Sequence, residues 1–195
     1  MSDKQTLAQA NPGGCFLAFN GEINRRSAEQ LVLLCSQAWG GGFAEVALCL
    51  NSPGGTLEHA YYAFNMLEAL PIRIVTYNTS AIQSAANMVY LCGDERYACP
   101  GSTFFFHQTR FFEPDGQVMT EALATERLKA IRLEDARTAQ IIANKTAQTL
   151  ECVRGWQTGE FLMTADEAIG HGVVHAVRAL AIPDNALFSQ IVLQD

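Results

Sequence analysis

The sequence changes from a strand pattern to a helix pattern at Ala81-Ile82-Gln83-Ser84-Ala85-Ala86-Asn87-Met88. Residues 72–77 are rich in β-branched side chains and predict a strand, whereas residues 85–91 are small and apolar and predict a buried helix. The polar residues 78–80 predict the turn and the helix N-cap. A hydroxyl in the first turn of such a helix lies near unpaired backbone N–H groups and the positive end of the helix dipole, which favour nearby negative charge. Ser84 is therefore a candidate nucleophile, although a lone serine here is better explained as a small residue that lets a helix pack closely.

Strand and helix patterns alternate before this stretch. Residues 15–19 and 45–50 predict strands, and residues 56–70 predict a helix that Pro71 ends. Another helix is predicted from Ser27, which forms a capping-box pattern with Gln30, up to the glycines at 40–42. Alternation of this kind predicts an α/β fold with parallel strand pairing.

The chain after this stretch predicts shorter strands and one long helix. Residues 96–99 and 103–106 read as strands, and the turn signal at 113–116 predicts a projecting hairpin. The remaining predictions are a long helix over 121–145, a helix over 150–156, an extended segment at 161–163, a capping box at 164–167 and a strand over 173–177. The tail beyond Pro183 gives no clear pattern.

Composition predicts one globular domain. The 195 residues are 49% hydrophobic and 17% charged, which is enough for a core that buries about 70% of the unfolded chain's surface. We expect this domain to span residues 14–195. Residues 1–13 are polar and end beside Asn11-Pro12-Gly13, so they predict a flexible N-terminal arm.

Charge and cysteine usage exclude several classes of protein. A net charge of −7 and a pI near 5.1, without a basic run, argue against nucleic acid or an anionic membrane as the main partner. The polar start has no secretory-signal pattern, and no apolar run reaches the roughly 18 residues of a membrane span, so a cytoplasmic protein is predicted. The six cysteines have no C-x-x-C pairing and lie mostly in apolar segments. They predict small core residues, without disulfides or zinc.

Acyl transfer also needs an oxyanion cradle and a base. Asn51-Ser52-Pro53-Gly54-Gly55 lies between a predicted strand and a predicted helix, where glycines let backbone N–H groups approach a substrate. An ordinary turn is the alternative, and it is favoured if the motif stands alone. His107 follows an apolar strand and precedes polar residues, so it is the best-placed base, with a structural histidine as the equal alternative.

The other histidines and the lysines are weaker candidates. His59 follows the glycines and faces either the site or solvent. His171 and His175 are four residues apart, but Gly172 and two valines between them disfavour a helix, so a metal pair is not expected. A Ser-Lys dyad is also disfavoured, because no lysine lies in a motif near Ser84 or Gly55; the lysines are Lys4, Lys129 and Lys145.

Taken in order, five motifs of the chain resemble those of ClpP, the proteolytic subunit family of the Clp protease. The resemblance runs from about Gly14 to Ala179, and its strength lies in the order and spacing of motifs that are individually weak. The motifs are residues 51–55, 83–85, 96–102, 107–108 and 161–174.

The resemblance implies a ClpP/crotonase-like α/β fold with repeated strand-strand-helix units, in which the hairpin and the long helix form a handle. It also implies a serine endopeptidase with Ser84 as nucleophile, His107 as general base, and the backbone N–H groups of Gly55 and Ala85 as oxyanion hole. Glu160 stands where the family's triad has aspartate. A carboxylate one methylene longer can still hold the imidazole tautomer, and the alternative is a non-productive geometry.

The resemblance further implies stacked rings of identical subunits that enclose a chamber for unfolded polypeptide or short peptides. An AAA+ unfoldase would feed that chamber and use the ATP, so no cofactor is expected on this chain. Ala86, Thr109, a shortened turn at 93–95 and an N-terminal arm unlike the family's pore loops depart from the pattern. Two alternatives stay open: a catalytically weak or inactive ClpP-like subunit with a structural or regulatory role, and an acyl-CoA enzyme of the crotonase type.

Overall fold

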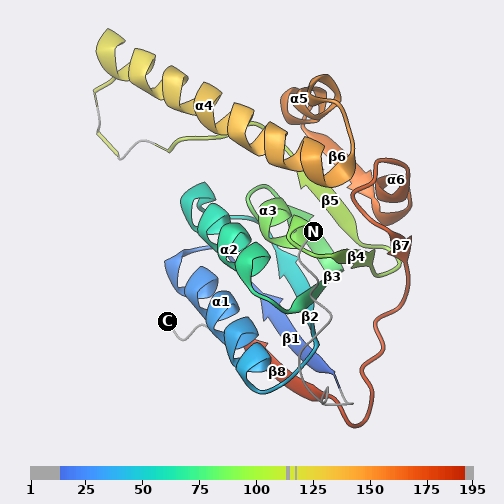
Figure 1. The fold of residues 1–195 in the computed structure, drawn as a ribbon. Helices are drawn as coiled ribbons and strands as arrows, with labels where there is room; N and C mark the ends of the chain where they lie inside the picture. The colour runs from blue at the N-terminus through green and yellow to red at the C-terminus, as the bar shows by residue number, and fades with distance from the viewer. Residues whose placement is uncertain (1–13, 113–114, 117, 192–195) are drawn as a thin grey trace. The chain divides into compact units, whose positions relative to one another are not determined.

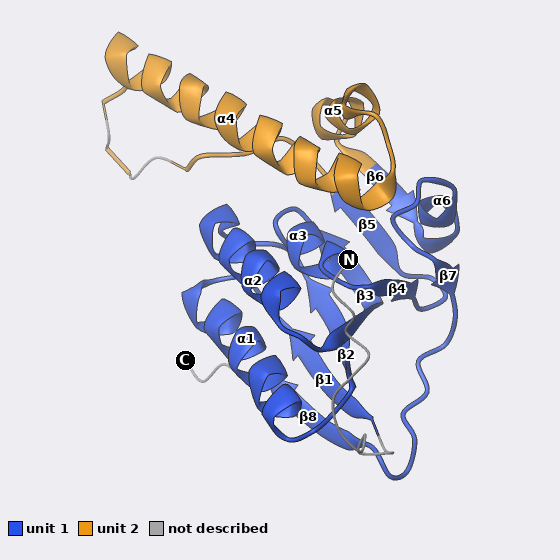
Figure 2. Ribbon diagram, viewed as in Figure 1, with its two compact units in different colours: residues 1–105, 162–195 blue, residues 106–161 orange. Residues whose placement is uncertain are grey.

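The computed structural model describes residues 14–112, 115–116 and 118–191. These residues form two compact units, one of residues up to 105 and from 162 onward, the other of residues 106–161 (Figure 2). The predicted N-terminal arm, residues 1–13, lies outside the described residues. A single domain over 14–195 stays a prediction, and the two units are treated separately.

The described residues form one eight-stranded sheet in the order β6-β5-β3-β2-β1-β8, with β4 paired to β3 and β7 (Figure 1). The pairs β1–β2, β1–β8, β2–β3, β3–β4, β3–β5 and β4–β7 are parallel, which confirms the predicted α/β architecture. The strands are β1 Cys15–Asn20, β2 Glu45–Ser52, β3 Arg73–Gln83, β4 Glu95–Ala98, β5 Thr103–Phe106, β6 Phe161–Thr164, β7 Ala176–Val177 and β8 Leu187–Ile191.

The helices follow the predicted segments closely. They are α1 Arg25–Gly40, α2 Leu57–Ala69, α3 Ala86–Leu91, α4 Glu121–Thr146, α5 Leu150–Thr158 and α6 Ala165–Gly170. The predicted capping box between Thr164 and Glu167 is confirmed at α6. At α1 the prediction was wrong, because Asn24 is the N-cap and forms the reciprocal bonds with Ser27, so the helix begins before Ser27.

The predicted turn at residues 78–80 is also wrong, because β3 continues through it to Gln83. The strand can continue because β3 pairs with β4 at Val75–Asn78 and then with β5 at Ala81–Gln83. The polar side chains form hydrogen bonds to the backbone of neighbouring segments. Asn78 Nδ2 donates to the Thr103 carbonyl at 2.8 Å, and Thr79 Oγ1 donates to the Leu50 carbonyl at 3.0 Å. The N-cap of α3 is Ala85, without a side-chain capping bond.

Two other predictions differ from the structure. No strand forms in the described part of residues 107–120, so the predicted hairpin is not a β-hairpin there. The predicted strand over 173–177 is reduced to the two residues of β7, because Val173 and Val174 are buried in the turn after α6, where both backbone N–H groups donate to the Ala168 carbonyl. The unpredicted strand β8 pairs with β1.

Alternating side chains of the sheet build two apolar layers. Leu17, Leu48 and Ile74 are buried, and the alternation of side chains along paired strands places them on the same face of the sheet. On the opposite side, a second cluster contains Tyr77 and Tyr97, which are direct partners across β3 and β4. The other members of this cluster are Phe16, Ala18, Ala47, Cys49, Val75 and Leu180.

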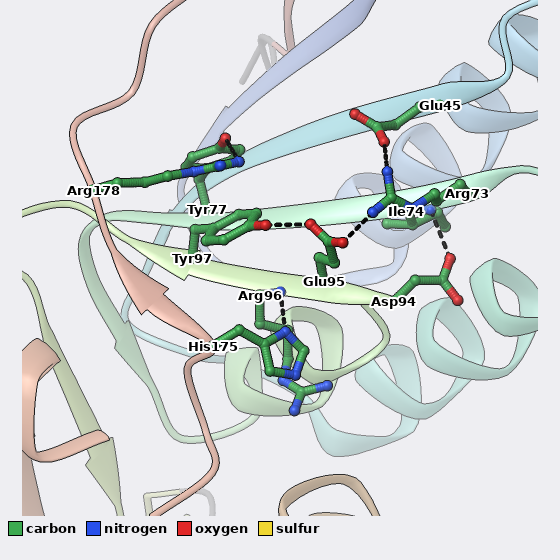
Figure 3. Close-up of polar contacts among 10 residues, drawn as sticks. All are labelled: Glu45, Arg73, Ile74, Tyr77, Asp94, Glu95, Arg96, Tyr97, His175 and Arg178. Atoms are coloured by element: carbon green, nitrogen blue, oxygen red, sulfur yellow. Dashed lines mark hydrogen bonds and ion pairs between the residues drawn. The ribbon is translucent and has the colours of Figure 1, made fainter. Parts of the chain in front are cut away.

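Polar side chains tie strand β4 and the chain after β7 into the first unit (Figure 3). The Arg178 guanidinium lies 3.3 Å from the ring centroid of Tyr97 and donates a hydrogen bond to the Tyr77 hydroxyl. On the other side of β4, the backbone N–H of Arg96 donates to the imidazole Nδ1 of His175 at 3.0 Å, and the backbone N–H of His175 donates to the Arg96 carbonyl at 2.8 Å. This reciprocal pair requires His175 Nδ1 to be unprotonated.

Candidate active site

Ser84 occupies a strained turn between β3 and α3. Its φ is 52°, in the left-handed region that residues other than glycine rarely adopt. Such a conformation costs on the order of 1–3 kcal/mol and persists only where the surrounding structure over-determines it. The Ser84 N–H donates to the Phe105 carbonyl at 3.0 Å, and its carbonyl accepts the Asn87 N–H at 3.1 Å. A sharp strand-to-helix turn of this kind also carries the serine of the nucleophile elbow in α/β-hydrolases.

Gly54 packs directly against this turn. A Cβ at Gly54 would lie 2.6 Å from Ser84 Cβ and 2.8 Å from the Gln83 carbonyl oxygen, and the φ of Gly54 is +102°. Only glycine, which has no Cβ, lets the backbone at position 54 come this close to the Ser84 turn. The structure therefore brings the predicted glycine motif to the predicted nucleophile, although the two are about thirty residues apart in the sequence.

The two predicted oxyanion donors flank this contact. The Ile23 N–H donates to the Gly54 carbonyl at 2.7 Å and the Ile23 carbonyl accepts the Thr56 N–H at 2.8 Å, which fixes Gly55 between them. Among the described residues, neither the Gly55 N–H nor the Ala85 N–H donates a hydrogen bond. Each can therefore bind a substrate oxygen without breaking an existing hydrogen bond.

His107 belongs to the second unit and follows β5 directly. Its Nδ1 lies 2.5 Å from the carbonyl oxygen of the next residue, Gln108. Asp135 of α4 holds this segment, because its carboxylate accepts the Thr109 N–H at 2.7 Å and the Gln108 amide at 3.3 Å. Sequence reasoning missed Asp135, since a single acidic residue on a long polar helix gives no signal of such a role.

Glu160 also lies in the second unit, just after α5. Its φ is 50°, and its carboxylate contacts the Arg110 guanidinium at 2.5 Å. The predicted contact of Glu160 with His107 stays a prediction, and the ion pair that the structure gives Glu160 is the one with Arg110. The side chains of Arg110 and Glu160 are 52% and 60% exposed. An ion pair this exposed contributes only about 0–1 kcal/mol.

The described residues also bear on metal and membrane binding. They contain no group of three or more His, Cys, Asp or Glu side chains arranged to hold a metal ion. No helix among them is both long and apolar enough to cross a bilayer. Cys15, Cys35, Cys49 and Cys92 are buried thiols, in agreement with their predicted role as small core residues.

Comparison with known proteins decides the family. A family model described as Clp protease matches residues 14–180, which is most of the chain. The chain belongs to the Clp protease family. The resemblance predicted from the motifs is thereby confirmed, and the Clp protease match contains all five predicted site residues, Gly55, Ser84, Ala85, His107 and Glu160.

Curated Clp protease subunits are distant relatives of this chain. ATP-dependent Clp protease proteolytic subunit 2 of Corynebacterium glutamicum is 27% identical, over 93% of this chain and 95% of that protein. The proteolytic subunit 2 of Pseudomonas aeruginosa is 26% identical, but the match spans 68% of this chain and 65% of that protein.

Solved Clp protease structures share the fold. ClpP1 from Listeria monocytogenes matches with a TM-score of 0.71 at 22% identity, over 85% of this chain and 92% of that chain. A mutant of that protein matches with a TM-score of 0.72, over 84% and 90% of the two chains. The ClpP/crotonase-like fold is therefore confirmed.

Proposed function

We propose that this Clp protease family member is a serine endopeptidase whose nucleophile is Ser84. The observation that carries the proposal is the left-handed conformation of Ser84 against Gly54. A strained serine has little use in packing. Beside the Gly55 and Ala85 N–H groups, which donate no hydrogen bond among the described residues, it meets the needs of acyl transfer.

In the proposed reaction, Ser84 Oγ attacks the carbonyl carbon of a peptide bond while His107 removes the hydroxyl proton. The N–H groups of Gly55 and Ala85 stabilise the negative oxygen of the tetrahedral intermediate. His107 then gives its proton to the leaving amine as the C–N bond breaks. Water, deprotonated by His107, hydrolyses the resulting ester with Ser84. No cofactor takes part in these steps.

Glu160 is the proposed partner that orients the imidazole of His107. In the structure its carboxylate contacts Arg110, but exposed pairs of this kind are weak and can be exchanged for another partner at little cost. A change of partner from Arg110 to His107 would complete the triad. Glutamate fills this position in triads on other folds.

The proposed substrates are unfolded polypeptides and short peptides, cleaved inside stacked rings of identical subunits. The names of the relatives, which describe proteolytic subunits of an ATP-dependent protease, support association with an ATP-driven AAA+ unfoldase. Nucleic acid and membrane are not proposed partners, and the proposed location is the cytoplasm.

Hydrolysis of a fluorogenic peptide and of an unfolded protein by the purified full-length chain tests the proposal. We expect Ser84→Ala to reduce turnover at least about a thousand-fold, as loss of a triad nucleophile does. Ser80→Ala is the matched control, because Ser80 is an exposed serine on the same strand. Turnover by Ser84→Ala equal to that of the wild type contradicts the proposal.

A second candidate function is a catalytically weak subunit that contributes rings or regulation to an assembly. The Arg110–Glu160 contact favours it, because a glutamate held by arginine does not orient His107. This candidate predicts that Glu160→Gln leaves peptide turnover unchanged, whereas the peptidase proposal predicts that turnover falls.

A further inference from the structure

Asn87 is a polar side chain buried in an apolar helix. It is 1% exposed and lies in the first turn of α3, where every other residue of the helix is an apolar or aromatic buried residue. Burying an amide is unfavourable unless hydrogen bonds replace those it made to water. The contacts of Asn87 therefore indicate why an amide is present.

A single nitrogen of this side chain holds two carbonyl groups. Asn87 Nδ2 donates to the Ser84 carbonyl at 3.0 Å and to the Phe105 carbonyl on β5 at 2.9 Å. The same Phe105 carbonyl accepts the Ser84 N–H at 3.0 Å. Ser84, Phe105 and Asn87 thus form a closed set of hydrogen bonds, which contains both backbone polar groups of Ser84.

This set of bonds restrains the strained residue on both sides. A residue with φ of 52° relaxes by rotating its backbone unless its N–H and its carbonyl are both held. Asn87 supplies one bond to the Ser84 carbonyl directly and secures the Phe105 carbonyl that holds the Ser84 N–H. Asn87 Oδ1 accepts no hydrogen bond from the described residues, so the amide acts here through its donors.

We propose that Asn87 is a positioning residue for Ser84: its side-chain amide clamps the Ser84 and Phe105 carbonyls and so keeps the serine in its left-handed conformation. The inference rests on the proposed peptidase function, because it assigns Asn87 to the reactivity of Ser84. The Phe105 bond also fixes β5 at Phe105. Asn87 itself touches neither substrate nor the reacting atoms.

The rate at which a fluorophosphonate labels Ser84 in the full-length protein measures this role. Asn87→Ala removes both donors, and we expect labelling to slow about ten- to hundred-fold, because small misplacements of reacting groups have effects of this size. Asn65→Ala is the matched control, since Asn65 lies on an exposed face of α2. The control should be labelled as fast as the wild type.

An isosteric variant separates hydrogen bonding from packing. Asn87→Asp keeps the volume, but its ionised carboxylate has no donor and faces two carbonyl oxygens, whereas the protonated acid regains one O–H donor. We therefore expect the labelling rate of Asn87→Asp, divided by that of the wild type, to rise as the pH is lowered. A role in packing alone predicts a ratio that does not change with pH.

The outcomes distinguish this inference from the function on which it rests. Folded Asn87→Ala and Asn87→Asp proteins that are labelled as fast as a reactive wild type overturn the positioning role. An unreactive wild type overturns the peptidase function instead, and hydrogen exchange of the Ser84 amide then tests the clamp: faster exchange in Asn87→Ala supports it, and unchanged exchange overturns it. If Asn87→Ala does not fold, Asn87→Ser replaces it, because serine keeps one hydrogen-bond donor. The fluorophosphonate should label Asn87→Ser at an intermediate rate. Labelling of Asn87→Ser at the wild-type rate overturns the inference.

Discussion

Gly54 and Ser84 lie so close together that the Gly54 position tolerates no side chain. We predict that Gly54→Ala lowers both peptide turnover and stability, because the added Cβ would meet Ser84 Cβ at 2.6 Å and its φ of +102° is unfavourable for alanine. The expected loss in free energy of unfolding is about 1–3 kcal/mol, measured by urea denaturation.

Gly42→Ala is the control for backbone strain. Gly42 also has a positive φ, +82°, but nothing lies within 4 Å of a Cβ built there. This variant should lose some stability and keep its peptide turnover. Equal turnover by the Gly54 and Gly42 variants would show that the close approach to Ser84 has no role in the chemistry.

Arg110 competes with His107 for the carboxylate of Glu160 if the proposed triad is correct. We predict that Arg110→Gln raises peptide turnover by at most about five-fold, because an exposed ion pair contributes no more than about 1 kcal/mol. Glu160→Gln should lower turnover in both the wild-type and the Arg110→Gln background. An Arg110→Gln protein that turns over peptide more slowly than the wild type would instead assign Arg110 a supporting role.

At the scale of secondary structure elements, the β4–β7 pair makes stability depend on pH through His175. Burial and then the positive charge of Arg96 lower the pKa of His175, while Glu95 acts in the opposite direction. Above the unfolded pKa of about 6.5, the His175 imidazole is neutral in both the folded and the unfolded state. Its contribution to the free energy of unfolding is then fully present. Below that pH the unfolded state binds the proton first, so the stability falls.

The variant His175→Asn tests this effect, because its side-chain oxygen can still accept the Arg96 N–H but does not titrate. From about pH 7.5 to about pH 5.5, urea denaturation should show a larger loss of unfolding free energy for the wild type than for His175→Asn. The other histidines are unchanged in the variant, so their titration cancels. If the free energy of unfolding changes equally with pH in the wild type and in His175→Asn, His175 is not the source of the pH dependence.

The elements that the sequence predicted well are those with strong hydrophobic periodicity. Strands β1 and β2 and helices α2 and α4 follow from their apolar patterns to within two residues. Strand β8 gives no such signal, because Leu187 and Phe188 are each about half exposed. The polar second half of β3 was mistaken for a turn, because Asn78 and Thr79 bind backbone carbonyls of neighbouring segments rather than cap a helix.

The candidate site was predictable only where it depends on short motifs. The glycine pair and Ser84 each follow a strand, so the topology of a parallel sheet brings them to the same edge. Contacts between side chains far apart in sequence, such as Arg110 with Glu160, leave no pattern in a single sequence. The amide of Asn87 has a role that only its bonds to two carbonyls reveal.

At the scale of the whole molecule, the proposed ring stacking makes a prediction about assembly. Leu133 is 64% exposed on α4, and the proposal assigns the long helix to contacts between rings. We predict that Leu133→Glu shifts the protein to smaller assemblies in sedimentation velocity without destabilising the subunit, because exposed substitutions rarely change folding stability by more than about 0.5 kcal/mol.

Gln140→Glu introduces the same charge at another exposed position of α4 and is the control. It should sediment like the wild type. A Leu133→Glu protein with the sedimentation coefficient of the wild type would show that α4 does not join rings through this face.

The central claim is that the strained serine on the turn after β3 is a nucleophile. Mass-spectrometric mapping of the fluorophosphonate adduct on the assembled, folded wild-type protein tests it most directly. We predict a single adduct on Ser84, lost in Ser84→Ala and retained in Ser80→Ala. A folded and assembled wild-type protein that carries no adduct, or one that carries it on another residue, would contradict the claim.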